Sequence, residues 1–250
     1  IINNAPGRVI DITALGGNLT VSTLVSNPNG GITLRSALAT SGTIMVDGGA
    51  GGMVTSAAGN TITLQADNLV LNGPVNAGAT GTVALTPYSP GRSIDLGGPA
   101  TGLLLDSSVN SYVTAGTLRI GDLNAGDITV NDASILPASV NTLSLITGGS
   151  ISQTAPISVA NLAVQSGGNA DLSDGGNMVG TLAAHLAGAL NFTNNAGLTV
   201  GTVDGLNGII GLDGNVPAGA VTLKAAGSIL LSNAITSTNV DINAGDQLMG

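Results

Sequence analysis

The side chains in this sequence that could do chemistry are mostly aspartates, because every acidic residue is Asp and none is Glu. Two groups lie close together in sequence: Asp171 with Asp174, and Asp122 with Asp127 and Asp132. Clustered carboxylates act as acid and base in carbohydrate-cleaving enzymes. Each of these aspartates stands near Gly or Asn at an expected corner, where Asp is a common turn residue. Only 1% of the chain is aromatic, which leaves little to hold a sugar, so we expect no catalytic residue.

Metal binding is the second chemistry to consider. Residues 167–172 are similar to the glycine-rich nonapeptide that binds Ca²⁺, but the second Gly is missing and the Asp comes one position early. Weak binding of Ca²⁺ at stacked Asp corners therefore stays only as an alternative. His185 is the single histidine and has no second ligand type nearby, so we expect a surface or corner residue. We predict no metal ligand and no cofactor.

Threonine and arginine patterns predict no site either. Thr61 and Thr63 fit the Thr-x-Thr rows of ice-binding proteins, but no equivalent pair returns at a regular interval. The arginines are dispersed along the chain and are expected to be solvated partners of nearby Asp: Arg8, Arg35, Arg92 and Arg119.

The composition predicts β-structure with tight corners. Hydrophobic residues make up 43% of the chain, and with so few aromatics the core must be built from Leu, Ile, Val and Ala. The 39 Gly residues suit corners that need a positive φ. The absence of Glu and the single Lys argue against exposed helical faces. A net charge of −9 disfavours nucleic acid and anionic membranes as partners, and the lack of Cys excludes disulfides.

A repeat of about 20 residues is the clearest pattern in the chain. Leu143, Leu162 and Leu182 lie 19 and 20 positions apart, and Val159 and Val179 precede the last two by three positions. Each repeat offers three short segments in which apolar and polar residues alternate. Such a repeat is typical of a solenoid, whose coils contact only their neighbours. We therefore predict an all-β, roughly triangular parallel β-helix that fills residues 1–250 as one continuous segment.

Short strands are predicted along the whole chain. In the less regular N-terminal half they are expected at residues 9–12, 19–24, 32–35, 43–46, 61–65, 69–71, 82–86 and 93–96. From residue 117 onward they are expected at residues 117–120, 127–130, 134–136, 142–145, 150–152, 156–159, 161–164, 171–173, 177–179, 221–224, 228–231 and 240–242. Residues 47–52 are expected to be a loop, and residues 199–215 a coil with longer corners. Leucines at four-residue spacing leave a short helix in residues 181–190 as an alternative to strand, turn and strand.

The two ends of the sequence lack targeting and capping features. No basic segment followed by an apolar stretch opens the chain, and no apolar run reaches 18 residues. We therefore expect no signal peptide here and no membrane insertion by this segment. Solenoids need polar caps for solubility, so we interpret the sequence as an internal piece of a longer protein. Uncovered strand edges predict that an isolated piece self-associates.

Two stretches resemble a known family. Residues 82–98 read TVALTPYSPGRSIDLGG, and residues 180–209 read GTLAAHLAGALNFTNNAGLTVGTVDGLNGI. Both are similar to segments of filamentous-haemagglutinin-like adhesins, the large secreted exoproteins of Gram-negative bacteria. The resemblance implies a right-handed β-helical shaft, an extracellular location on the bacterial cell surface, and a role in attachment or in fibres. Asn27-Pro28-Asn29-Gly30 is also similar to a signature of the family's secretion domain, although a type I turn explains the motif as well.

Three functions are consistent with these observations. The first is a non-catalytic structural shaft of a secreted cell-surface exoprotein that serves adhesion or extracellular filament formation. The second is a self-assembling fibre or sheath subunit whose lateral packing is its function. The third is a carbohydrate-active β-helix enzyme. The expected partners are further copies of the protein, end to end or laterally, and, for an adhesin, host or neighbouring-cell surfaces.

Overall fold

The structure, a computed structural model, describes residues 1–99, 101–212 and 218–250. The described part is all-β, with long parallel sheets and little helix, which is consistent with the predicted β-helix. Contacts divide the chain into two compact units: Ile1–Gly121 with Ser134–Val140, and Asp122–Ala133 with Asn141–Gly250. They are called unit 1 and unit 2 below, and each is described by itself. None of the described helices is both long and apolar enough to cross a membrane.

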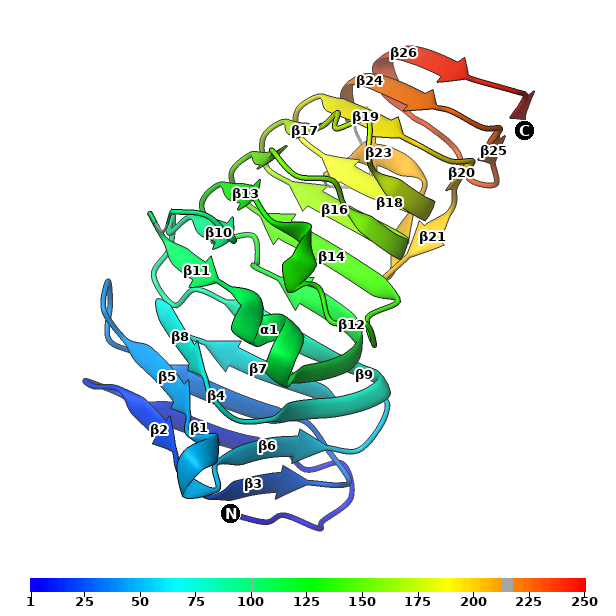
Figure 1. The fold of residues 1–250 in the computed structure, drawn as a ribbon. Helices are drawn as coiled ribbons and strands as arrows, with labels where there is room; N and C mark the ends of the chain where they lie inside the picture. Colours follow the sequence, from blue (N-terminus) through cyan, green and yellow to red (C-terminus); the bar gives the residue numbers. More distant parts are fainter. Residues whose placement is uncertain (100, 213–217) are drawn as a thin grey trace. The chain divides into compact units, whose positions relative to one another are not determined.

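Unit 1 is built from short parallel strands (blue to green in Figure 1). Its main sheet contains, in order, β1 (Ile10–Ala14), β4 (Ile32–Ser36), β7 (Thr61–Gln65), β9 (Val75–Thr86) and β12 (Val113–Ile120). β3 (Leu24–Asn27) pairs with β6 (Met53–Ser56), which also pairs with β9. A separate sheet contains β2 (Leu19–Val21), β5 (Thr43–Val46) and β8 (Asn68–Leu71), and β10 (Ile94–Leu96) pairs with β11 (Leu103–Leu105).

The core of unit 1 consists of aliphatic rows that run across the strands. Because successive residues of a strand point to opposite faces, every second residue faces inward. The register then stacks similar residues: Ile32 pairs with Ile62, and Ile62 pairs with Val83, each at most 1% exposed. The next inward row is also fully buried and contains Leu34, Leu64 and Leu85. Branched aliphatic side chains of similar size therefore fill these two rows without aromatic residues.

Unit 2 follows the same plan (green to red in Figure 1). One sheet contains, in order, β14 (Thr142–Thr147), β16 (Ser158–Ser166), β18 (Met178–Leu186), β20 (Leu198–Val200), β25 (Ile229–Leu231) and β27 (Leu248–Met249), and β23 (Ile209–Gly211) also pairs with β18. The other contains β13 (Ile128–Val130), β15 (Ile151–Gln153), β17 (Ala170–Leu172), β19 (Leu190–Asn194), β24 (Ala218–Ala225) and β26 (Ser237–Ala244).

The register of unit 2 confirms the predicted stacking of the repeat. Leu143 pairs with Leu162, 19 positions on, and Leu162 pairs with Leu182, 20 positions on. All three side chains are 0% exposed. Val159 likewise pairs with Val179. Larger steps occur where loops intervene, as between β19 and β24, whose paired residues lie 31 positions apart.

Most predicted strands are confirmed, and the exceptions have local causes. Residues 19–24 form two strands, β2 and β3, rather than one. Residues 134–136 are not a strand, because a 3₁₀ helix, Ala133–Ile135, occupies most of this segment. The predicted loop at residues 47–52 contains another single-turn 3₁₀ helix, Gly48–Ala50, in which the Gly51 amide donates to the Gly48 carbonyl at 3.1 Å.

Three elements of unit 1 were not predicted: β6, β11 and the helix α1 (Ser107–Tyr112). The helix begins at Asp106, whose Oδ1 accepts a hydrogen bond from the Ser108 amide at 2.9 Å. An aspartate at this position satisfies an amide that the first helical turn leaves unpaired. The Asp-Ser-Ser sequence is a recognisable cap signal, but the helix is too short to show an apolar period.

Residues 181–190 form strand, turn and strand, because β18 ends in this segment and β19 starts there. The helical alternative is therefore wrong. The leucines fit the strand equally well: Leu182 and Leu186 lie an even number of residues apart and both point inward.

The predicted coil at residues 199–215 contains an antiparallel hairpin, and residues 213–215 of that prediction lie outside the described residues. β21 (Thr202–Val203) pairs with β22 (Leu206–Asn207) through the turn residues Asp204 and Gly205. Both turn residues have a positive φ, 46° and 84°, which is the conformation that makes Asp-Gly a favoured two-residue hairpin turn. The chain enters and leaves the hairpin at Gly201 and Gly208, and the Gly208 amide donates to the Gly201 carbonyl at 2.8 Å.

The leucine rows generate the first prediction. Leu162→Ala should lower the free energy of unfolding by about 2–5 kcal/mol, because it removes a fully buried side chain and leaves a cavity. Gln165→Ala, on the outer face of the same strand, is the control and should change that free energy by less than about 0.5 kcal/mol. Urea unfolding followed by circular dichroism measures both. Equal effects of the two substitutions would contradict the row as the core.

Candidate functional site

The aspartates singled out from the sequence lie at turns and on outer faces of unit 2. The Asp174 carboxylate accepts a hydrogen bond from the Gly176 amide at 2.7 Å, and Asp122 accepts one from the Asn124 amide at 2.8 Å. Both contacts span two residues, as in the turns that Asp commonly stabilises. The turn interpretation of these two residues is therefore confirmed.

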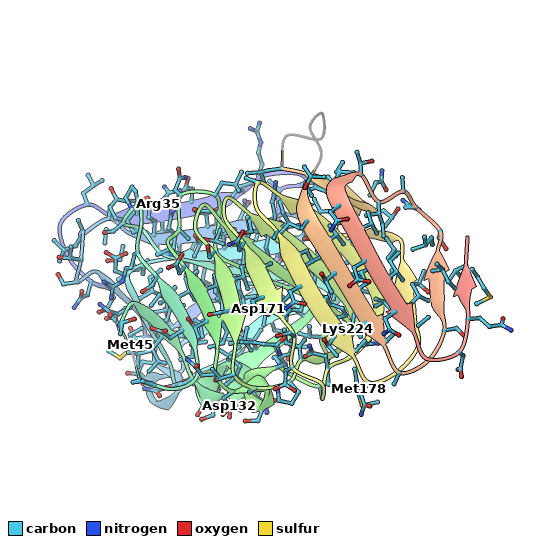
Figure 2. The ribbon with its side chains drawn as sticks, turned by 90° about the horizontal axis from the view of Figure 1, so that it is seen from above. Arg35, Met45, Asp132, Asp171, Met178 and Lys224 are labelled. Atoms are coloured by element: carbon cyan, nitrogen blue, oxygen red, sulfur yellow. The ribbon has the colours of Figure 1, made fainter. Side chains whose placement is uncertain are left out.

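The other three aspartates also show no convergent arrangement. Asp127 accepts a hydrogen bond from the Ser150 amide at 2.7 Å, and so joins two layers. Asp171 is not at the expected corner: it is exposed in the middle of β17 and accepts a hydrogen bond from the Asn191 side chain at 3.3 Å. Asp132 is half-buried (Figure 2). Within residues 1–99, 101–212 and 218–250, no three residues of the types His, Cys, Asp and Glu gather as a metal ion would need.

The sequence predicted a surface or corner residue at position 185, and the structure places His185 within a strand rather than at a corner. It lies within β18 and pairs in register with Gln165 on one side and Ile210 on the other. Its side chain is partly buried, and its Nε2 atom is fully buried without a hydrogen-bond partner. The sequence does not indicate that this histidine is partly buried, because the hairpin near it is an insertion in the repeat.

Two arginines of unit 1, Arg35 and Arg92, differ from the expected solvated ion pairs. Arg35 donates from Nε to the Gln65 side-chain oxygen at 2.6 Å rather than to an aspartate (Figure 2). Arg92 does have an aspartate partner, with 3.9 Å between Nε and the Asp67 Oδ1 atom. The Arg92 side chain is only 20% exposed, and its guanidinium also donates to the main-chain oxygens of Asp67 and Gly102, both at 3.0 Å.

Asp67 is the centre of a polar network in unit 1. Its side chain is 0% exposed. Oδ1 accepts hydrogen bonds from the amides of Tyr88 at 3.0 Å and Ser89 at 2.8 Å. Oδ2 accepts from the Ser89 hydroxyl and from the Thr40 amide, both at 2.5 Å. Thr40 has a φ of 68°, which is costly for a β-branched residue, so the bond to Asp67 offsets local strain.

The surroundings of Asp67 favour its charged form. Burial is the strongest single influence and raises the pKa of this carboxyl group. The hydrogen bonds from Ser89 and Thr40, together with the charge of Arg92, lower the pKa by more, so that it lies below its ordinary value. A carboxylate of this kind contributes stability at neutral pH, and the contribution is lost as the pH falls through the lowered pKa. Asp67 is thus a structural group that holds two loops, and it is not poised as an acid or base.

Asp67→Asn generates the second prediction. The substitution keeps the shape of the side chain but removes the charge and one acceptor, so the free energy of unfolding at pH 7 should fall by about 3 kcal/mol. Below about pH 4 the native protein should lose this contribution to its stability, so the difference in the free energy of unfolding between the native protein and the variant should shrink. Urea unfolding at a series of pH values measures it. Asp171→Asn, at an exposed position, is the control, and indistinguishable pH profiles for the two variants would contradict the assignment.

In unit 2, the side chains of two buried asparagines hydrogen-bond main-chain groups at places where the layers differ in length. Asn177 is 0% exposed, and its Oδ1 accepts from the Ile157 amide at 2.7 Å. Its Nδ2 donates to the main-chain oxygens of Leu172 and Thr193, both at 3.0 Å. The Gln153 amide completes the set by exchanging hydrogen bonds of 2.9 and 3.0 Å with it.

Asn194 makes an equivalent contact with the start of β18. Its Oδ1 accepts from the Val179 amide at 2.8 Å, and its Nδ2 donates to the Val179 carbonyl at 3.0 Å. Residues 195–197 form no strand, so the side-chain amide of Asn194 takes the place that a neighbouring strand would have. The edge of β18 at Val179 is therefore closed by a side chain from the same chain.

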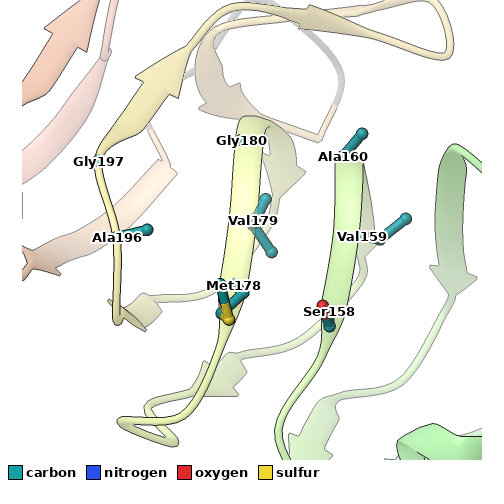
Figure 3. A pocket seen from close by; sticks show the side chains of 8 residues that line it. All are labelled: Ser158, Val159, Ala160, Met178, Val179, Gly180, Ala196 and Gly197. Atoms are coloured by element: carbon teal, nitrogen blue, oxygen red, sulfur yellow. The ribbon is translucent and has the colours of Figure 1, made fainter.

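A shallow groove of about 350 Å³ lies over this part of unit 2 (Figure 3). Its base includes Val159 and Val179, which are 7% and 1% exposed, and Met178 at its rim is 54% exposed. It is lined by Ser158, Val159, Ala160, Met178, Val179, Gly180, Ala196 and Gly197. The lining carries no charged side chain and only one hydroxyl group. Such a surface can contact another apolar or main-chain surface but supplies no acid, base or metal ligand.

Asn194→Ala generates the third prediction. It leaves the buried amide and carbonyl of Val179 without partners, so the free energy of unfolding should fall by about 2–4 kcal/mol. Amide exchange at Val179 should accelerate at the same time. Asn195→Ala, at the exposed neighbouring position, is the matched control and should change neither quantity. Unchanged protection of Val179 in the Asn194 variant would show that the side chain does not close this edge.

The Asn27-Pro28-Asn29-Gly30 motif forms a turn, as its alternative interpretation predicts. The Gly30 amide donates to the Asn27 carbonyl at 3.4 Å. The buried Asn27 side chain donates to the carbonyls of Arg8 and Gly31, both at 2.7 Å. The motif therefore joins the first residues of the chain to the turn. Its similarity to a secretion-domain signature stays a prediction.

The threonines at positions 61 and 63 continue in opposite directions across the sheet. Thr61 pairs with Thr82, and Thr82 pairs with Thr117, which the sequence pattern missed because these steps are 21 and 35 positions. Thr63 pairs with Thr33 on β4 and with Ala84 on β9. The Thr-x-Thr pair is therefore not repeated on the next strand, as expected.

Comparison of the chain with protein-family models, with curated proteins and with solved structures finds no match. The geometry described above is therefore the basis for any functional assignment.

Proposed function

We propose that this chain is a non-catalytic structural shaft of a secreted cell-surface exoprotein, serving adhesion or extracellular filament formation. In this proposal both units are right-handed β-helices with about 20 residues per coil and a roughly triangular cross-section. The observation that carries the proposal is the row of identical leucines, Leu143, Leu162 and Leu182, in register and fully buried. Rows of this kind extend by adding layers, so a longer chain forms a longer structure.

The polar groups support the same proposal. Asp67, Asn177 and Asn194 are buried, and their oxygens accept hydrogen bonds mainly from main-chain amides. Groups used in this way fix loops and strand edges and are not available for chemistry with a ligand. The sequence resemblance to filamentous-haemagglutinin-like adhesins adds the expectation of an extracellular bacterial cell-surface location.

A self-assembling fibre or sheath subunit is the second candidate, because unit 1 has apolar rows on its outer surface. Met45 (labelled in Figure 2) pairs in register with Val70, and Val70 is 39% exposed. Leu24 pairs in register with Met53, and these two are 37% and 38% exposed. Exposed apolar residues in register offer a regular surface for lateral contact with another copy.

The fourth prediction concerns the form of the native full-length protein, and electron cryomicroscopy tests both candidates. Separate rods of stacked layers are expected for a shaft, and rods bundled laterally would favour the fibre subunit. In the second case a variant with Met45→Ser and Val70→Ser should dissociate the bundles, whereas Thr43→Ser, on the same strand, should not. A compact protein with helices would overturn the β-helix.

Antibodies against this chain should label intact cells, and labelling only after permeabilisation would overturn the surface location.

A further inference from the structure

The β21–β22 hairpin lies on the outer face of unit 2, where it covers residues of two parallel strands. Val203 of the hairpin, 4% exposed, forms a buried cluster with Ala163 and Ala183, both 0% exposed. Leu206 packs against the same cluster. Ala163 and Ala183 pair in register on β16 and β18. Because alanine side chains are small, they make few apolar contacts with the hairpin and attach it only weakly.

Polar contacts supply the rest of the attachment. The Asn233 side chain donates to the Thr202 hydroxyl at 3.1 Å and to the Asn207 side-chain oxygen at 3.4 Å. His185, two positions beyond Ala183 on β18, hydrogen-bonds the main chain of Asn207. A hairpin with two residues in each strand has little stability of its own, so these contacts determine whether it stays closed.

The surroundings of the His185 imidazole favour its neutral form. Its Nε2 atom is fully buried and has no hydrogen-bond partner. A proton on this nitrogen would place a charged donor in a buried site without an acceptor, which is costly. Opening of the hairpin would bring water to the nitrogen and remove that cost.

The charged groups on the elements around His185 do not supply the missing acceptor. Among the described residues of β16, β19, β20, β21, β22, β23 and β24 and of the hairpin turn, the charged ones are Asp204 and Lys224. Asp204 belongs to the turn, and Lys224 is exposed on a strand of the other sheet (Figure 2). No hydrogen bond joins either of them to Nε2.

We propose that the β21–β22 hairpin is an acid-released latch: protonation of His185 frees the hairpin from the outer face of β16 and β18 while the parallel sheets stay intact. Release uncovers Val203, Leu206 and the alanine pair beneath them as a new apolar surface. The direction of the pH effect follows from the environment, since burial lowers the pKa of His185 by more than the hydrogen bond to Asn207 raises it. The closed hairpin is therefore most stable above about pH 6.5 and loses stability as the pH falls through the lowered pKa.

Hydrogen exchange of the amides in residues 202–207 tests this fifth prediction. After correction for the intrinsic rates, protection should fall by up to about tenfold for each pH unit below about 6.5, until the lowered pKa is reached. Protection of β16 and β18 should not change. In His185→Gln, which keeps a donor but does not titrate, protection of the hairpin should be independent of pH. Asn233→Ala, the matched control, should lower protection equally at pH 7.5 and pH 5, and Asp204→Asn should keep the native pH dependence.

A second readout follows the titration of His185 directly, beginning with the native protein. Because His185 is the only histidine, its imidazole resonances can be followed by NMR without further assignment. In the native protein its pKa should lie below about 6.5, and in a variant with Val203→Ser and Leu206→Ser, which opens the hairpin, it should return to about 6.5. A native titration at the ordinary value, or hairpin protection that is equal at pH 7.5 and pH 5, would overturn the proposal.

Discussion

Parallel pairing in register between successive layers is the constraint on which the rest of the structure depends. It satisfies the main chain of each strand through its neighbours, and it places like residues on like residues. At the corners the pairing stops, so side chains must take its place. Ser166 donates to the Gly149 carbonyl at 2.8 Å, and Ser36 donates to the Gly17 carbonyl at 2.8 Å. The abundance of small polar residues in this chain follows from the number of its corners.

The rows could be predicted from the sequence because their signal is local and repeated. Leu143, Leu162 and Leu182 recur at nearly constant spacing, so a count of positions is enough to stack them. Unit 1 was harder, because its steps vary, and 21 positions between Thr61 and Thr82 are followed by 35 between Thr82 and Thr117. The individual strands were still visible there, since alternation within a strand does not depend on the spacing between layers.

The buried polar centres could not be predicted from the sequence. Asp67 receives hydrogen bonds from residues 21 to 27 positions away, and nothing in the sequence indicates which turn approaches it. The burial of His185 depends on a hairpin that interrupts the repeat after β20. Its Asp204-Gly205 turn was present in the sequence as a hairpin signal, but the signal is weak against a background of many glycines. Irregular insertions are therefore what limits prediction from this sequence, whereas the repeating layers can be predicted.

The hairpin also shows how the wall tolerates added chain. Gly201 and Gly208 are joined by a hydrogen bond of 2.8 Å, and the layers on both sides of the insertion keep their register, with Leu182 paired to Val200 and Ala184 paired to Ile209. The break in the strand is thus closed at its base, and what lies between the two glycines is outside the hydrogen-bonded wall. For protein engineering, the Asp204–Gly205 tip is a natural place to graft a foreign peptide for display.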